Sequence, residues 1–296
     1  LLGGSDQPDR KQADGANGLQ CRVWLLSLVR RVKFMENEID RQLIAIEPED
    51  RLVVMARTLD VTSTDARHLL EQHAGEWRNL CGTCLGRSLY RHHSIFRGQS
   101  DVPVWSHAEF TYFREIIPAE VITRFIQPIP AAGVKLLRAE LLLTTPGAFA
   151  FPIAWPGSSQ RLDRKPSIEY LDVNPDRLAD YRDMMRRYIG PAAAKLVAMD
   201  KLGTFRSMET AAVLFQDPAL GTSWNQIHLS EVVAAGFSGF GEEFDAALRE
   251  TLPHGSFADI FAGLTDMRTI PRWTLNDPVF EDDAAVSEWA EELARY

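Results

Sequence analysis

The sequence WNQIHLSE, residues 224–231, decides the fold. Polar and apolar side chains alternate along it, and this period of two is the pattern of a β-strand with two different faces. It predicts the centre of a strand over Ser223–Val233. The turn residues Asp217-Pro218 and Gly221 come before it and follow the apolar run Thr204–Phe215. We therefore expect two antiparallel strands joined by a short turn.

The segments on either side of this strand pair complete the order β-α-β-β-α-β. Asn174-Pro175 begins the first helix, because asparagine caps helices and proline suits their first turn. The remaining elements are a strand at Ser167–Val173, a first helix interrupted at Gly190-Pro191 and ending at Leu202, a second helix at Ser238–Leu252, and a fourth strand within 257–274 whose core is Ala258–Leu264. This order is that of a ferredoxin-like unit, and the predicted fold class is α+β.

The N-terminal half predicts helices and a β-hairpin before this unit. Apolar residues three or four positions apart indicate helices, and Thr62-Ser63-Thr64-Asp65 resembles a capping box that starts a new one. The expected elements are two short helices within 49–74, an irregular segment at 76–105, a helix over 108–127, and a hairpin of Val134–Leu143 and Ala148–Trp155 around Thr145-Pro146-Gly147.

The domain organisation follows from these segments. Residues 1–34 are rich in Gly, Asp, Gln and Asn at their start, and they predict a disordered or non-native leader before Met35. An N-terminal region at 35–156 is followed by a Pro- and Ser-containing linker at 156–166 and by the ferredoxin-like domain at 167–280. Residues 281–296 predict an acidic amphipathic helix at the C-terminus.

Composition restricts the partners of the protein. Its net charge of −9 argues against a general affinity for nucleic acid or for anionic membranes, which attract clustered Lys and Arg. Three cysteines do not make a disulfide framework, and no apolar run reaches the roughly 18 residues of a membrane helix. We expect a cytoplasmic protein that binds a small organic ligand and neither nucleic acid nor membrane.

The segment Ser167–Trp273 resembles the dimeric α/β-barrel superfamily, through its element order and the strand at 224–231. In that superfamily ferredoxin-like units pair their sheets face to face and enclose a cavity. Its members include oxygenases, decarboxylases, cyclases, haem enzymes and proteins without catalysis, so the resemblance implies a fold but selects neither a reaction nor a cofactor. The N-terminal half would then cover the sheet or supply a degenerate second half.

The candidate site lies on one face of the 224–231 strand. Ile227 and Leu229 suit the layer that packs on helices, which leaves Gln226, His228 and Ser230 on the opposite, cavity face. On the paired strand, either Arg206, Met208 and Thr210 or Phe205, Ser207 and Glu209 share that face, and the first strand offers either Tyr170 and Asp172 or Glu169. The register, which the sequence does not fix, decides between these sets.

The leading functional hypothesis is a small-molecule enzyme or binding protein with a mainly apolar cavity. His228 would act as the acid–base or hydrogen-bonding group, because histidine titrates near neutral pH. Gln226 would orient the ligand, and Arg206 would pair with a carboxylate or oxyanion. The cavity would be lined by Trp224, Ser230, Tyr170 and Met208. The alternative is a non-catalytic interaction or regulatory subunit, with His228 hydrogen-bonded inside a dimer interface.

A second candidate site is the pair Cys81 and Cys84, with His92 and His93 downstream. Two cysteines separated by two residues can bind zinc or form a redox disulfide, and two histidines would complete a four-ligand zinc site. The spacing matches no standard zinc finger, so incidental cysteines are the third reading.

The open face of the predicted sheet favours a homodimer. Trp224, Met208 and Tyr170 are too apolar for a face in contact with water, whereas a second copy would cover them. The competing prediction is that Val134–Trp155 and the preceding helix cover the same face within one chain.

Overall fold

A computed structural model describes most of the chain from residue 51 onward. The described residues are 51–73, 84–100, 102, 104–114, 117–127, 133–151, 164–233, 240–250, 252 and 255–293. The expected leader at 1–34 lies outside them, as does the linker at 156–166 apart from its last three residues, which begin a strand.

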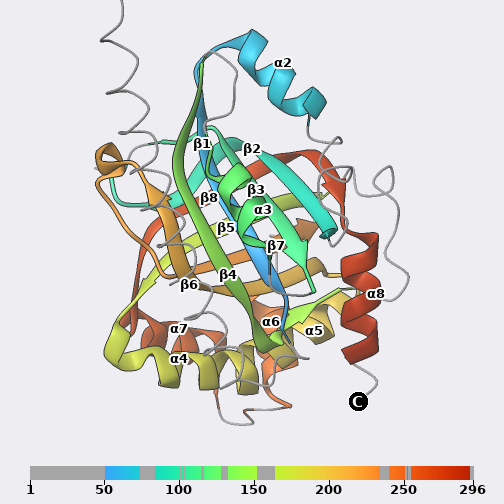
Figure 1. The fold of residues 1–296 in the computed structure, drawn as a ribbon. Helices are drawn as coiled ribbons and strands as arrows, with labels where there is room; N and C mark the ends of the chain where they lie inside the picture. Colours follow the sequence, from blue (N-terminus) through green and yellow to red (C-terminus); the bar gives the residue numbers. More distant parts are fainter. Residues whose placement is uncertain are drawn as a thin grey trace, which may run out of the picture.

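The centre of the molecule is a closed antiparallel barrel (Figure 1). Its strand order is β1-β3-β2-β8-β5-β7-β6-β4, after which β4 pairs with β1. The strands are β1 (Val53–Val61), β2 (Cys84–Gly98), β3 (His107–Phe113), β4 (Val134–Ala150), β5 (Arg164–Val173), β6 (Leu202–Gln216), β7 (Gln226–Val233) and β8 (Arg268–Asp282). Because the sheet closes on itself, every strand has one face toward the barrel interior and one face outward.

The barrel consists of two halves with the same strand arrangement. In the first half the order is β4-β1-β3-β2, and in the second it is β8-β5-β7-β6. Each half therefore places its first and third strands at the centre and its second and fourth strands at the edges. The pairs β2–β8 and β4–β6 join the halves edge to edge. The α+β class and the antiparallel sheet are confirmed.

Most of the helices cover the outside of the barrel, whereas α8 packs Val286 and Trp289 against the interior cluster. In Figure 1, α4, α5, α6 and α7 gather on one side of it, beside the strands of the second half, whereas α2 stands at the opposite end. A π-helical turn at Met185–Ile189 joins α4 to α5 without a break. The bounds are α2 (Thr64–His73), α3 (Ala119–Phe125), α4 (Leu178–Met184), α5 (Gly190–Ala198), α6 (Phe240–Leu248), α7 (Phe257–Thr265) and α8 (Ala284–Leu293). Among the described residues, none of the helices has the length and apolar character needed to span a bilayer.

The barrel interior is filled with large side chains. Its buried cluster includes Trp105, Tyr170 and Trp224, whose rings touch one another at centroid distances of 4.7 to 5.4 Å. Ile227 and Leu229 belong to this cluster. A separate buried cluster lies between the second half of the sheet and its helices. Most apolar burial is therefore divided between the inside of the barrel and the layer beneath the helices.

The sequence predictions for the first half were largely wrong. The first helix expected within 49–74 is the strand β1, and the start of the helix expected over 108–127 is the strand β3, whereas the end of that segment is the helix α3; both strands are buried on both faces. Apolar residues in both segments also lie three or four positions apart, such as Phe110 and Phe113 in β3, so the helical pattern was chosen over the strand pattern. Cys84–Gly98, expected to be irregular, is a strand as well. The capping prediction is confirmed for its hydroxyl, because Ser63 Oγ accepts from the backbone N–H of Ala66 at the start of α2.

Two further expectations were wrong for a local reason. The hairpin predicted around Thr145-Pro146-Gly147 is a single strand, β4, with a bulge: its pairing to β6 jumps from Thr144 to Phe149. A bulge accommodates a proline that would disrupt a regular ladder. Ala258–Leu264, expected as the fourth strand, lies in helix α7, which a capping box at Ser256 begins, and the strand β8 follows it.

The remaining predictions of the second half agree with the structure. The expected strands are found in β5, β6 and β7, and the C-terminal helix is α8. The side chain of Asn174 accepts a hydrogen bond from the N–H of Asp176, as a cap should. Gly221 has a φ of 64°, the left-handed conformation that ends the turn before β7.

The face that suggested a homodimer is enclosed by the same chain. Trp224, Met208 and Tyr170 are buried inside the barrel, which strands of the N-terminal half complete. Dimerisation through this face is therefore corrected in favour of the intramolecular alternative, although the cover is a half-barrel rather than a hairpin.

The contact between Gly190 and Gly147 is one on which the fold depends. A Cβ on Gly190 would overlap with the carbonyl group of Gly147, where α5 packs on the bulge of β4. We expect Gly190→Ala to lower the free energy of unfolding by about 3 kcal/mol, the upper range for overpacked sites. Urea-induced unfolding measures this loss.

The matched control is Gly263→Ala in α7, where the nearest neighbour of an added Cβ is Met184 at 3.9 Å. This variant should gain up to about 1 kcal/mol, because alanine favours the helix interior. Equal unfolding midpoints for the two variants would contradict the close approach of α5 to β4.

Candidate functional site

A cavity lies between the outer face of the second half-sheet and its helices. Its volume is about 380 Å³, within the size range of small-molecule sites. The strands contribute Ser167, Glu169, Phe205, His228, Ser230 and Trp273, among others, and the helical layer contributes mainly apolar side chains such as Met185, Ile189, Ala193, Phe244, Phe261 and Leu264. The cavity thus combines apolar walls with a few polar groups on the sheet.

The polar groups form a chain of four side chains. His228 Nδ1 lies 3.5 Å from Glu169 Oε2, and the Tyr181 hydroxyl lies 3.2 Å from His228 Nε2. Arg268 Nη1 donates to the Tyr181 oxygen at 2.7 Å and lies 3.9 Å from Glu169 Oε2. This arrangement places the imidazole proton on Nδ1, facing the carboxylate, and makes Nε2 the acceptor of the tyrosine proton.

Secondary structure brings these four residues together. Glu169 on β5 is the direct cross-strand partner of His228 on β7, which in turn pairs with Ser207 on β6. Tyr181 comes from α4 and stacks on the imidazole at a centroid distance of 6.1 Å. Arg268 is the first residue of β8 and pairs with Val173 at the end of β5. Three strands and one helix therefore fix the geometry.

Burial and charge set the protonation states in this chain. Burial lowers the pKa of His228, and the nearby Glu169 offsets part of that effect. Burial acts to raise the pKa of Glu169, but the hydrogen bond with His228 and the charge of Arg268 hold it below its ordinary value. Burial raises the pKa of Tyr181 to about 12. At neutral pH the chain therefore contains an ionised Glu169, a neutral His228, a neutral Tyr181 and a cationic Arg268.

The sequence placed His228 on the wrong face of the sheet. Ile227 and Leu229 point into the barrel, whereas His228 and Ser230 face the helices. The assignment failed because the barrel interior, and not the helical layer, takes the apolar Ile227 and Leu229. The proposed cavity inside the barrel is replaced by the cavity beneath the helices.

The other predicted site residues are divided between the two faces. Of the alternatives left open by register, Glu169 and Phe205 join His228 at the cavity. Gln226 is buried and does not line it. Four residues predicted for the same site lie on the inner side of the barrel instead: Arg206, Met208, Tyr170 and Trp224.

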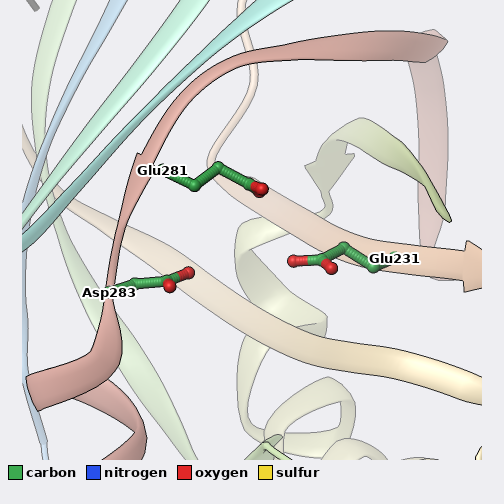
Figure 2. Close-up of side chains that lie close together, drawn as sticks. All are labelled: Glu231, Glu281 and Asp283. Atoms are coloured by element: carbon green, nitrogen blue, oxygen red, sulfur yellow. The ribbon is translucent and has the colours of Figure 1, made fainter. Parts of the chain in front are cut away.

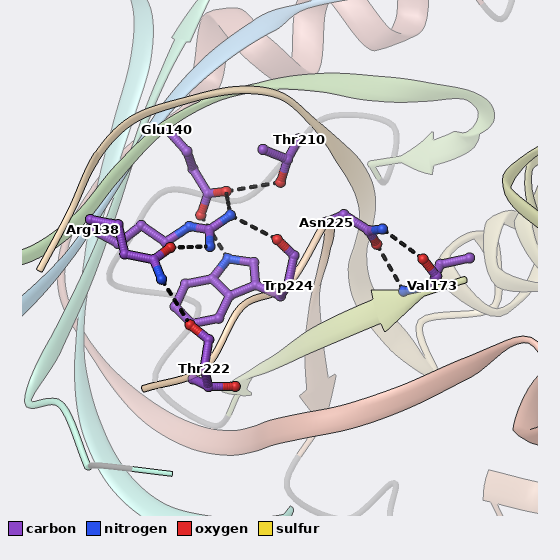
Figure 3. A network of polar contacts seen from close by, with 8 residues as sticks. Arg138, Glu140, Val173, Thr210, Thr222, Trp224 and Asn225 are labelled. Carbon is purple, nitrogen blue, oxygen red and sulfur yellow. Dashed lines mark hydrogen bonds and ion pairs between the residues drawn. The ribbon is translucent and has the colours of Figure 1, made fainter. Parts of the chain in front are cut away.

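Trp224 connects neighbouring strands of the barrel through hydrogen bonds. Its indole Nε1 donates to Glu140 Oε1 at 2.7 Å, and its carbonyl oxygen accepts from Arg138 at 2.7 Å (Figure 3). The Arg138 guanidinium also lies 4.3 Å from the indole centroid, and Thr210 donates to Glu140. These contacts connect the start of β7 to β4 and β6, so they explain the tryptophan without a ligand.

Arg206 is held in a cluster of carboxylates. Figure 2 shows Glu231, Glu281 and Asp283 directed toward one another, with ligand atoms within 4.8 Å of each other. The Arg206 guanidinium donates to Glu231 at 3.0 Å and to Asp283 at 2.9 Å, and also to the Tyr112 hydroxyl at 2.8 Å. The buried Arg206 pairs with two of these three acids and Glu281 accepts from Tyr90, so the cluster is a structural polar network between β6, β7 and the end of β8.

The predicted zinc or redox site is not tested by the described part of the chain. Cys81 lies outside the described residues, and Cys84 Sγ contacts the carbonyl oxygen of Gly86 at 3.3 Å. His93 lies 3.4 Å from Asp277, and burial lowers the pKa of His92. The zinc, redox and incidental readings therefore all remain predictions.

Two members of the polar chain were missed from the sequence. Tyr181 was read only as part of an apolar helix face, and Arg268 fell in a segment whose strand was misplaced. A buried arginine and a tyrosine hydroxyl need partners, but the pairing depends on contacts between distant segments. Correct placement of β8 would have brought Arg268 beside Val173 and pointed to the site.

Comparison with known proteins gives similarity of fold only. No protein-family model matches the chain, and no curated protein matches it. Solved structures that it resembles include an anthrone oxidase-like protein (11% identity, 79% of this chain and 93% of that one, TM-score 0.48). Others are a candidate monooxygenase from Lactobacillus acidophilus NCFM (7%, 78% and 95%, 0.45) and a chlorite dismutase mutant from Candidatus Nitrospira defluvii with cyanide (11%, 85% and 99%, 0.41).

The resemblance to the dimeric α/β-barrel superfamily seen in the sequence stays a weak one, because these structures are 7–11% identical to the chain and match it at TM-scores below 0.5. At such identities and TM-scores, none of them carries a conclusion about activity.

We expect the imidazole of His228 to titrate below the ordinary value of about 6.5. Because the unfolded chain binds this proton more readily, the contribution to stability is present above about pH 6.5 and is lost as the pH falls below it. Glu169→Gln removes the charge that favours the imidazolium, so the pKa should fall further. Nitrogen NMR of labelled histidines between about pH 4 and pH 8 measures both values.

Asp172→Asn is the control for this titration, because it removes a carboxylate from the same strand at an exposed position. It should leave the His228 pKa unchanged. A His228 pKa that rises in Glu169→Gln would contradict the ion-pair geometry.

Arg206→Met should destabilise the barrel by about 3–5 kcal/mol at neutral pH, because it leaves buried carboxylates without their cation. The loss should shrink in acid, since unpaired carboxylates acquire raised pKa values and the folded variant then gains stability as they are protonated. Urea unfolding across pH measures both effects. Arg177→Met, which removes only an exposed pair with Asp180, is expected to cost less than about 1 kcal/mol. A pH-independent loss in Arg206→Met would contradict the ion network.

Proposed function

We propose that this protein binds a small, mainly apolar molecule in the cavity beside His228, as an enzyme or as a ligand-binding protein. The observation that supports the proposal is the combination of an apolar cavity of about 380 Å³ with the Glu169–His228 pair at its sheet wall. A few polar groups in an otherwise apolar cavity orient a ligand and give it specificity. A subunit that used this surface only for assembly would have no need of such a cavity, which disfavours the non-catalytic alternative.

The chemistry of the wall indicates which ligand group it would take. The lowered pKa of Glu169 makes it an ionised hydrogen-bond acceptor rather than a strong base. Ser167 accepts a hydrogen bond from Trp273 Nε1 at 2.6 Å, so its own hydroxyl hydrogen can be donated to a ligand. The cavity therefore suits an apolar molecule that carries a hydroxyl or an amine facing Glu169.

The role of His228 follows from its contacts. Its two ring nitrogens face Glu169 and Tyr181, so it acts on a ligand chiefly through the carboxylate that it holds ionised. If the protein is an enzyme, the reaction class that fits is proton transfer at the O–H or N–H group of the ligand. Glu169 would touch that group, and His228 and Tyr181 would adjust its charge.

The architecture supports a related proposal about the fold. Each half repeats the β-α-β-β-α-β order with its first and third strands central, and the halves join edge to edge. We infer that the chain is a single-chain form of the dimeric α/β barrel, in which the second half carries the ligand site.

Filling the cavity tests the proposed function. N-phenyl-1-naphthylamine, an apolar fluorescent amine, should bind the wild-type protein with increased emission. Ala193→Phe places a ring in the cavity from α5 and should weaken this binding at least about tenfold, because it removes the space for the probe.

Ala194→Phe is the matched control, since Ala194 is the next residue of α5 and is exposed. It should bind the probe as the wild type does. If both variants bind the probe equally well, the cavity is not the binding site and the proposal fails.

A further inference from the structure

A second cavity adjoins the first. Its volume is about 330 Å³, and it shares Phe261, Leu264 and Arg268 with the cavity beside His228. Its other lining residues are Arg97, Gly98, Gln99, Thr265, Thr269 and Ile270. It therefore lies between the end of β2, the end of α7 and the start of β8.

The lining of the second cavity is positively charged. Arg97 and Arg268 contribute two cations, Gln99 and the threonines contribute neutral donors, and none of the nine lining residues is acidic. The whole chain carries a net charge of −9, so the charge of the second cavity is opposite in sign to that of the whole protein. Such a surface favours an anionic group, which arginine binds through its planar set of donors.

Arg268 is the residue that connects the two cavities. It lines both of them, and its Nη1 atom lies 3.9 Å from the Glu169 carboxylate in the first. A guanidinium has five N–H donors, so the hydrogen bond to Tyr181 does not exhaust its capacity. An acceptor and a cation thus stand side by side at the boundary between the cavities.

We propose that the ligand is an apolar molecule with a carboxylate next to a hydroxyl or amine group, such as a 2-hydroxy acid with an aliphatic tail. The tail occupies the first cavity, the hydroxyl donates to Glu169, and the carboxylate enters the second cavity beside Arg268 and Arg97. The short distance between Glu169 and Arg268 requires the two polar groups of the ligand to be neighbours. This inference rests on the proposed function, because it needs the first cavity to bind the tail.

The inference is tested by measuring how well three eight-carbon compounds displace N-phenyl-1-naphthylamine from the protein. In the wild type, 2-hydroxyoctanoate should displace the probe at a concentration about tenfold lower than 1,2-octanediol, which lacks the charge. It should also act at a lower concentration than 8-hydroxyoctanoate, whose polar groups are far apart. Arg97→Ala should abolish most of the preference for the acid over the diol, because it removes one of the two cations.

Arg91→Ala is the matched control, since it removes the same charge from the same strand, β2, at a position that lines neither cavity. It should keep the preference. The inference is wrong if the wild type binds the probe but the acid and the diol displace it at equal concentrations. It is also wrong if Arg97→Ala keeps the full preference for the acid. In both cases the proposed function stands. If the probe itself does not bind in the first cavity, both are wrong.

Discussion

Closure of the barrel through the β2–β8 and β4–β6 pairs is the constraint on which the rest of the structure depends. Once the sheet is closed, the central part of the inner face is shielded from water, and it holds aromatic and aliphatic side chains packed against one another together with paired charges such as Arg206 and Glu231. On β5 and β7, Glu169, His228 and Ser230 then face outward, toward the helices, whereas Glu231 stays inside, where it pairs with Arg206. Closure therefore decides both that the interior holds Ile227 and Leu229 and that His228 and Glu169 lie in the helical layer, where a cavity remains.

The two halves carry different residues at the cross-strand pair on the outer face of the sheet. The cross-strand pair that joins first and third strands on the outer face is Arg57–Glu109 in the first half and Glu169–His228 in the second. In the first half, Glu109 accepts from both Arg57 and Arg87, and Phe125 of α3 covers Arg57 at 4.6 Å. Paired arginines outweigh burial and lower the pKa of Glu109, so this site is a closed ion network. The second half carries a neutral imidazole and an adjacent cavity instead, which makes it the half suited to a ligand.

The sequence predicted the second half well because its strands are polar on one side. Alternation in β7, the Asn174 cap and the turn at Gly221 are local signals, and they gave elements that the structure confirms. The same reasoning failed in the first half because β1 and β3 are buried on both faces, and because the apolar residues of both segments also fit helical spacing. The site was half predicted: His228 and Ser230 were found, Glu169 was one of two options, and Tyr181 and Arg268 required knowledge of tertiary contacts. The face of the strand depended on closure, which no local pattern encodes.

Charge balance explains how four ionisable side chains can border an apolar cavity. One anion, Glu169, and one cation, Arg268, cancel, while burial keeps His228 and Tyr181 neutral. A second full charge added to this chain would lack a partner in a poorly hydrated layer and would cost several kcal/mol. A ligand that brought only a carboxylate into the first cavity would meet Glu169 and be repelled, whereas a neutral donor would be accepted. The second cavity is the more favourable place for an anion, because its lining carries Arg97 and Arg268 and no acid. The charges of the protein therefore favour a neutral donor of the ligand in the first cavity and an anionic group in the adjoining second cavity.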